Sequence, residues 1–175
     1  MARFYLVRHG EFTYKPVEER NFIGHGLELA PLTEDGIRQA VECSKDKRLA
    51  GCDLIITSPY TRALQTAAIL SKNLGIDIRV EIDLREHELD LSYQVKSHED
   101  LKRIASEEQK NNGLLPENGS FRWELRTDVK TRALNVLARY TTYKKVIVVT
   151  HGMVIHCLTG AVGIPHCSVH EFDMD

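Results

Sequence analysis

Short runs of apolar residues, many of them β-branched, alternate with longer amphipathic segments along the chain. The runs span residues 3–7, 53–57, 78–82 and 145–150, with a weaker candidate at 168–172. Uniformly apolar strands that are separated by helices are typical of a parallel sheet covered on both faces. The pattern therefore predicts a three-layer α/β/α fold with a mainly parallel central sheet.

Four helices are predicted between these strands. Thr33 precedes a segment with acidic residues in its first turn, and Ser58 and Pro59 are expected to open a second helix that ends at Gly75. Further helices are predicted within residues 97–110 and from about 121 to 140. Residues 111–120, rich in Gly, Asn and Pro, predict a loop between those two helices.

The composition indicates one globular domain over residues 1–175. The chain is 42% hydrophobic and 27% charged, with no repeat and no convincing linker. A net charge of -2 argues against a nucleic-acid or anionic-membrane partner, because either would require a surplus of Lys and Arg. The N-terminal apolar run is too short for a signal peptide or a membrane span, so a cytoplasmic protein is expected.

The cysteines do not indicate a metal site. Cys43, Cys52, Cys157 and Cys167 form no CxxC pair, and the histidines near the last two lack zinc-type spacing. They are expected to be structural thiols in a reducing compartment. Neither a metal nor a cofactor is predicted.

Reactive side chains follow four of the predicted strands. His9 follows the first strand, Arg62 lies in the first turn of the helix after the second, Glu86 follows the third and His151 follows the fourth. The carboxyl ends of parallel strands share one edge of the sheet, where open α/β folds bind ligands. We expect these side chains to converge there.

This combination suits phosphoryl chemistry. Arg8 and Arg62 could bind a phosphoryl group, since Arg stays charged and offers several donors. A neutral His can attack phosphorus, and a second imidazole can hydrogen-bond the phosphoryl oxygens. A carboxylic acid such as Glu86 could protonate the leaving alkoxide and afterwards activate water, and Glu88 and Asp90 are its close competitors.

Five segments resemble the motifs of the histidine phosphatase superfamily, in the branch that includes the phosphoglycerate mutase-like enzymes. They are LVRHGE, PLTEDGIRQA, ITSPYTRALQTAAIL, LREHELD and VVTHGMVI, in the family's order over nearly the whole chain. The resemblance implies the family's three-layer α/β fold. It also implies that His9 is the phosphorylated nucleophile, that Arg8, Arg62 and His151 bind the phosphoryl group, and that Glu86 is the proton donor.

Within the superfamily, a metal-independent phosphatase acting on a small phosphomonoester is the favoured function. In the histidine acid phosphatases an Asp follows the late His, whereas Gly152 follows His151 here, and the small protein-phosphohistidine phosphatases generally lack the acid that Glu86 supplies. Mutases carry a C-terminal tail, but this sequence ends at Asp175, just after its last candidate strand. Phosphoglycerate mutase activity and a catalytically silent phosphate- or phosphopeptide-binding domain remain the alternatives.

The substrate pocket departs from the family pattern. Many relatives have an Asn where this chain has Lys15, so either Lys15 or Asn21 is a candidate to replace it. Gly152 and Met153 are also expected to contact the substrate, a small phosphorylated metabolite. A substrate-covering segment is expected around residues 88–123, where Asn118 and Gly119 replace the usual Gly and Glu of a PxGES motif.

Other polar and aromatic residues are expected to be mostly structural. Glu11 either positions an arginine or is a surface acid, and Ser58 is expected to cap a helix rather than take part in catalysis. Trp123 and Tyr14 are interpreted as core residues more readily than as a substrate cover. Surface or core positions are expected for the remaining histidines, although His87 could line the pocket: His25, His87, His98, His156, His166 and His170.

Overall fold

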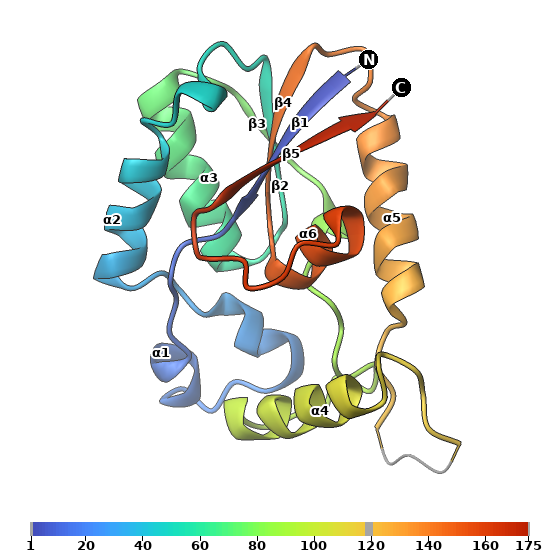
Figure 1. The fold of residues 1–175 in the computed structure, drawn as a ribbon. Coiled ribbons are helices and arrows are strands. Elements are labelled where there is room, and N and C mark those ends of the chain that lie inside the picture. Colours follow the sequence, from blue (N-terminus) through green and yellow to red (C-terminus); the bar gives the residue numbers. More distant parts are fainter. Residues whose placement is uncertain (1, 118–120, 175) are drawn as a thin grey trace.

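A five-stranded sheet forms the centre of the computed structural model, which describes residues 2–117 and 121–174. The strand order is β3-β2-β4-β1-β5 (Figure 1). The strands are β1 (Ala2–Arg8), β2 (Leu54–Thr57), β3 (Ile78–Val80), β4 (Lys145–Thr150) and β5 (Val169–Met174). Neighbouring strands are parallel except for β5, which pairs antiparallel with β1. This confirms the predicted, mainly parallel sheet.

Helices and short 3-10 turns connect the strands. The helices are α1 (Lys15–Glu18), α2 (Glu34–Cys43), α3 (Thr61–Leu74), α4 (His98–Lys110), α5 (Arg126–Ala138) and α6 (Gly152–Thr159). The 3-10 turns are η1 (Gly24–Leu29), η2 (Lys47–Leu49) and η3 (Ile82–Leu84). Within the described residues, none of the helices combines the length and the apolar character needed to cross a membrane.

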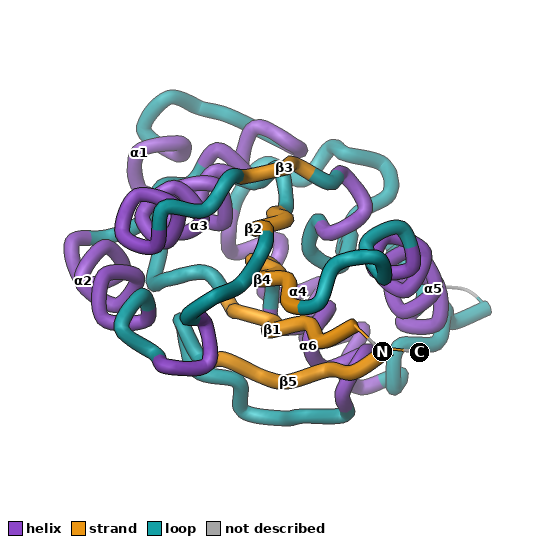
Figure 2. Tube along the Cα trace, turned by 90° about the horizontal axis from the view of Figure 1, so that it is seen from above, coloured by secondary structure: helices purple, strands orange, loops and turns teal. Residues whose placement is uncertain are grey.

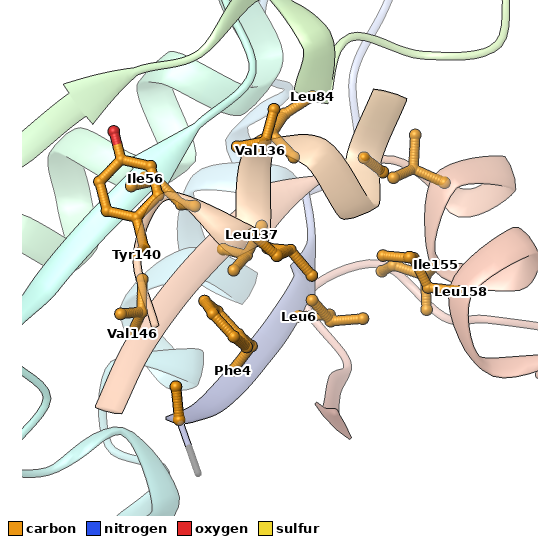
Figure 3. Close-up of a cluster of buried hydrophobic side chains, with 14 of the residues drawn as sticks. Phe4, Leu6, Ile56, Leu84, Val136, Leu137, Tyr140, Val146, Ile155 and Leu158 are labelled. Carbon is orange, nitrogen blue, oxygen red and sulfur yellow. The ribbon is translucent and has the colours of Figure 1, made fainter. Parts of the chain in front are cut away.

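The two faces of the sheet bury alternate residues of the same strands, because successive side chains of a strand point to opposite faces. Tyr5 and Ile55 pack with residues of α2 and α3. Phe4, Leu6 and Ile56 pack with residues of α5 and α6 (Figure 3). Seen from above, α2 and α3 lie on one side of the sheet and α5 on the other (Figure 2). The three layers are thus those that the sequence predicts.

A smaller third cluster lies beyond the carboxyl ends of β1, β2 and β4. It joins α1, η1 and α4, which lie below the sheet in Figure 1. Its buried members are Val17, Leu27, Ala30, Val95, Ile104 and Trp123. Trp123 is 1% exposed, so the interpretation of it as a core residue is confirmed. The cluster fixes α4 opposite the edge of the sheet at which the site residues converge.

Several predicted boundaries shift. Thr33 caps α2 by accepting a hydrogen bond from the Gly36 amide, as expected, but α2 ends at Cys43 because η2 follows. The prediction that Ser58 caps the second helix is wrong, since α3 begins at Thr61 with Tyr60 at its N-cap. Gly75 does end α3, in the left-handed conformation that favours glycine.

Candidate active site

His9 lies directly after β1 and is 2% exposed. Its Nδ1 donates a hydrogen bond to the Gly10 carbonyl oxygen at 2.8 Å, which leaves the Nε2 lone pair free. The Gly10 amide in turn donates to Thr66 Oγ1 of α3 at 3.1 Å. These contacts fix the ring with Nε2 as the potential nucleophilic atom.

The turn after His9 packs tightly against α2. A Cβ atom on Gly10 would lie 2.6 Å from the Gly36 carbonyl oxygen, and one on Gly36 would lie 2.0 Å from the Glu11 carbonyl oxygen. Only glycine fits this close backbone contact. Glu11 accepts a hydrogen bond from the Thr33 hydroxyl, so it supports the start of α2 rather than an arginine.

Both predicted arginines lie beside His9, and each keeps donors unused. Arg62 is 3% exposed and donates from one terminal nitrogen to Glu28 Oε2 at 2.6 Å. Arg8 donates to the Ile164 carbonyl oxygen at 2.5 Å. The buried Nε atom of each guanidinium has no hydrogen-bond partner among the described residues.

His151 is the N-cap residue of α6, and its ring centroid lies 5.0 Å from that of His9. Its Nε2 lies 2.7 Å from Ser58 Oγ, which also accepts the Tyr60 amide. Its Nδ1 is buried without a partner among the described residues. Ser58 is therefore a neighbour of the site and not a helix cap.

Glu86 follows η3, and both its carboxylate and its backbone carbonyl oxygen accept hydrogen bonds. Its carboxylate accepts a hydrogen bond from the backbone amide of His87 at 2.9 Å. Arg132 of α5 donates to the Glu86 carbonyl oxygen at 3.1 Å and to both carboxylate oxygens of Glu124. Glu86 also lines one cavity with Arg62 and another with Arg8, so it lies near both arginines as expected.

Glu88 and Asp90, the other two candidates for the proton donor, already accept hydrogen bonds. Glu88 accepts hydrogen bonds from Tyr60 and Arg85. Both oxygens of Asp90 accept hydrogen bonds within its own loop. Glu86 is thus the acid whose surroundings best fit a proton donor.

Burial shifts the pKa values of the central groups. It lowers the pKa of His9 well below its usual value, and the nearby Arg62 and Arg8 lower it further. Burial and Arg62 likewise lower the pKa of His151. Burial raises the pKa of Glu86, against the opposing effect of its backbone amide donors. Burial thus shifts His9, His151 and Glu86 toward their uncharged forms.

Buried polar atoms without partners concentrate around His9. Within residues 2–117 and 121–174, the side-chain atoms of this kind are Arg8 Nε, Arg62 Nε, His151 Nδ1 and His166 Nε2. The His166 ring centroid lies 5.6 Å from that of His9. Buried polar groups are normally hydrogen-bonded, so this set indicates a site for a ligand rich in acceptor oxygens.

The four residues that are expected to contact the substrate lie at different distances from the arginines and Glu86. Gly152 lies against the Arg8 guanidinium, and Met153 lines a cavity that Arg8 and Glu86 also line. Lys15 is exposed and pairs with Glu19, and Asn21 is exposed in a left-handed conformation. The structure therefore brings neither Lys15 nor Asn21 to the phosphoryl pocket. Asn118 and Gly119, which replace the usual Gly and Glu of the PxGES motif, lie outside the described residues.

Sequence reasoning missed several residues around the site. Glu28 pairs with Arg62, Ser58 contacts His151, and Arg132 holds the loop that carries Glu86. His166 was expected in a structural role. No spacing signal marks Glu28 or Arg132, because their partners lie far away in the sequence.

A cavity of about 230 Å³ opens from Arg62 and Glu86 toward α4. Tyr14 and His87 line it. A wider cavity of about 670 Å³ lies on the other side of Glu86 and reaches Arg8, Gly152 and Met153. Arg62 and Glu86 thus line one cavity, and Arg8 and Glu86 line the other.

Comparisons with known proteins find a matching family and similar sequences. The model of the histidine phosphatase superfamily (branch 1) matches residues 4–175. A probable phosphoglycerate mutase GpmB of Cronobacter sakazakii is 33% identical over 99% of this chain and 85% of its own length.

Solved structures share the fold. Bacillus stearothermophilus YhfR matches with a TM-score of 0.75 and 27% identity, over 100% of this chain and 92% of its own. A mycobacterial glucosyl-3-phosphoglycerate phosphatase matches with a TM-score of 0.71 and 24% identity, over 98% and 90% of the two chains.

Proposed function

Because this chain belongs to the histidine phosphatase superfamily, we propose that it hydrolyses a small phosphomonoester through a phosphohistidine intermediate at His9. The observation that carries this proposal is the set of unpartnered buried nitrogens of Arg8, Arg62 and His151 around a histidine with a free Nε2. A tetrahedral phosphoryl group presents oxygens that these nitrogens can bind.

In the first half-reaction, Nε2 of neutral His9 attacks phosphorus as the bond from phosphorus to the ester oxygen breaks. Arg8 and Arg62 balance the charge of the phosphoryl oxygens. If the Ser58 hydroxyl donates to His151 Nε2, the ring proton of His151 lies on Nδ1, the atom without another partner. Protonated Glu86 gives its proton to the leaving alkoxide, so that the alcohol departs neutral.

In the second half-reaction, the Glu86 carboxylate takes a proton from water as the water oxygen attacks phosphorus. The bond between phosphorus and His9 Nε2 breaks, and inorganic phosphate leaves. His9 and Glu86 return to their starting protonation states. The arginines and imidazoles supply the charge stabilisation, so this route uses no metal ion.

The names of similar proteins support phosphoryl chemistry in general. The similar solved structures include a glucosyl-3-phosphoglycerate phosphatase and a putative α-ribazole-5'-P phosphatase, whereas curated relatives are named probable phosphoglycerate mutases. Hydrolysis and mutase activity share the phosphohistidine step and differ in the acceptor of the phosphoryl group. A test must therefore detect the phosphorylated enzyme and also identify the final acceptor of the phosphoryl group.

The decisive experiment is intact mass spectrometry of enzyme quenched in alkali within milliseconds of mixing with an aryl phosphate. We expect a transient gain of one phosphoryl group in the wild type and none in His9→Ala, with phosphate released in step. Circular dichroism of His9→Ala checks that the variant is folded. Phosphate release without an adduct would exclude His9 as the nucleophile.

Product analysis separates the alternatives. Interconversion of phosphoglycerates faster than phosphate release would favour mutase activity. Tight phosphate binding without turnover on a broad panel of phosphomonoesters would favour a silent binding domain.

A further inference from the structure

The cavity between Arg62 and α4 has flat side chains on its walls. The His25 and Tyr93 rings stack with centroids 4.3 Å apart, and the Tyr14 and His98 rings also lie 4.3 Å apart. Leu101 and Ala105 of α4 add apolar surface. A cavity of this size and lining suits a ring or a short hydrocarbon chain.

Glu28 stands where this cavity meets the phosphoryl pocket. Its Oε2 accepts from Arg62, but Oε1 has no hydrogen-bond partner in the part of the chain that the structure describes. The side chain is 21% exposed, so the carboxylate is largely withdrawn from bulk water. Glu28 thus lines the cavity beside Arg62 with one carboxylate oxygen that accepts no hydrogen bond from the described residues.

The cavity offers no comparable free cation. Among its described lining residues, the side chains with a permanent positive charge are Arg62 and Lys102, and the imidazoles of His25, His87 and His98 also line it. Of the other lining acids, Glu88 pairs with Arg85, and Asp90 accepts hydrogen bonds within its own loop. Arg62 belongs to the phosphoryl pocket, while Lys102 is more than half exposed and pairs with Glu99 at 2.8 Å. A second negative group on the substrate would therefore meet Glu28 without a compensating positive charge, whereas an ammonium or hydroxyl group could donate to Glu28.

Resting on the proposed function, we infer that this cavity receives the alcohol part of the substrate. Glu28 determines which charge that alcohol part can carry. Glu28 selects phosphomonoesters of uncharged or cationic ring-bearing alcohols over those whose alcohol part carries a carboxylate or a second phosphate. Phosphoglycerates fall in the disfavoured class. The inference thus separates this chain from the activity for which its curated relatives are named.

Three matched substrates test this inference. They are phenyl phosphates whose para substituent is an aminoethyl, a propyl or a carboxyethyl chain, which differ in terminal charge but little in leaving-group chemistry. At neutral pH and low salt we expect kcat/KM to be roughly tenfold or more higher for the amine than for the carboxylate, with the propyl compound between them. Added salt should reduce this ratio.

Variants assign the preference to Glu28. In Glu28→Gln the ratio of amine to carboxylate should fall toward one, and in Glu28→Asp, which keeps the charge, a preference should remain. Glu42→Gln removes the same charge from the exposed face of α2 and should leave the wild-type ratio unchanged. Circular dichroism checks the fold of each variant.

The outcomes separate the two proposals. Turnover of all three compounds without a charge preference, or with a preference that survives in Glu28→Gln, would overturn the role of Glu28. No turnover of any compound, with no phosphoryl adduct on His9, would overturn the proposed function and this inference together.

Discussion

The Nε2 atom of His151 lies 2.7 Å from Oγ of Ser58, and both residues are fully buried. Ser58 precedes α3 and His151 precedes α6, so this contact joins the segments that lead into the two helices. A hydroxyl that donates to Nε2 fixes the ring proton on Nδ1. Ser58 is thus a positioning residue for His151.

Replacing Ser58 by Ala should remove the hydrogen-bond partner that orients the His151 ring. The buried His151 Nε2 would lose its partner, at a cost of about 1–3 kcal/mol in the free energy of unfolding. We expect kcat to fall roughly a hundredfold with little change in KM, since a preorganised donor to the transition state is misplaced. Urea unfolding and steady-state kinetics measure the two effects.

Ser71 of α3 offers a matched control. Ser71→Ala removes a hydrogen bond to the Ile76 carbonyl oxygen at the far end of α3. It should reduce stability and leave kcat unchanged. An equal fall in kcat in both variants would mean that Ser58 acts only through the stability of α3.

The pH dependence should be bell-shaped. The rate should fall at low pH as His9 gains a proton, and burial, which lowers the pKa of His9, places this limb below the ordinary value of 6.5. The rate should fall at higher pH as Glu86 loses its proton, above the ordinary 4.5, because burial raises its pKa. Measurement of kcat/KM from acidic to alkaline pH checks both limbs.

Glu86→Gln tests the assignment of the alkaline limb. The variant should lose that limb, and its rate loss should be larger for an alkyl phosphate than for nitrophenyl phosphate, whose leaving group needs no proton. A variant that keeps the wild-type profile would exclude Glu86 as the donor. Glu88→Gln is the comparison, because Glu88 is already bound by Tyr60 and Arg85.

Removal of metal ions should not affect turnover. In the proposed route Arg8 and Arg62 supply the positive charge at the phosphoryl group, so dialysis against a chelator should change kcat by less than about twofold. The measurement is phosphate release before and after chelation. Loss of activity that a divalent cation restores would contradict this route.

Arg132 should be essential for both stability and rate. It bonds Glu124 through two nitrogens and the carbonyl oxygens of Asp83, Arg85 and Glu86. Arg132→Leu leaves Glu124 buried without its main partner, which should cost about 3–5 kcal/mol. Because the loop that carries Glu86 is then free to move, kcat should also fall.

Arg38→Leu is the control for this prediction. Arg38 pairs with Asp35 on the exposed side of α2, where an ion pair contributes at most about 1 kcal/mol. Urea unfolding of both variants, with kcat measured in parallel, gives the comparison. A similar small loss of stability in both would contradict the structural role of Arg132.

The sequence by itself determined the layers and the central residues of the site. Apolar runs such as that before His9 can be recognised locally, because a strand buried on both faces must be apolar along its length. The same runs end at His9 and His151, and parallel strands bring their carboxyl ends to one edge. The convergence of these two histidines therefore followed from topology alone.

Only the tertiary structure decided the contacts that surround those residues. Glu28 meets Arg62, and Arg132 meets the Glu86 loop, through side chains whose partners lie 34 and 46 positions away. Ser58 showed the pattern of a helix cap, yet α3 begins later and its hydroxyl is left to His151. Such contacts depend on side-chain packing across elements, and no local pattern of polar and apolar residues encodes that packing.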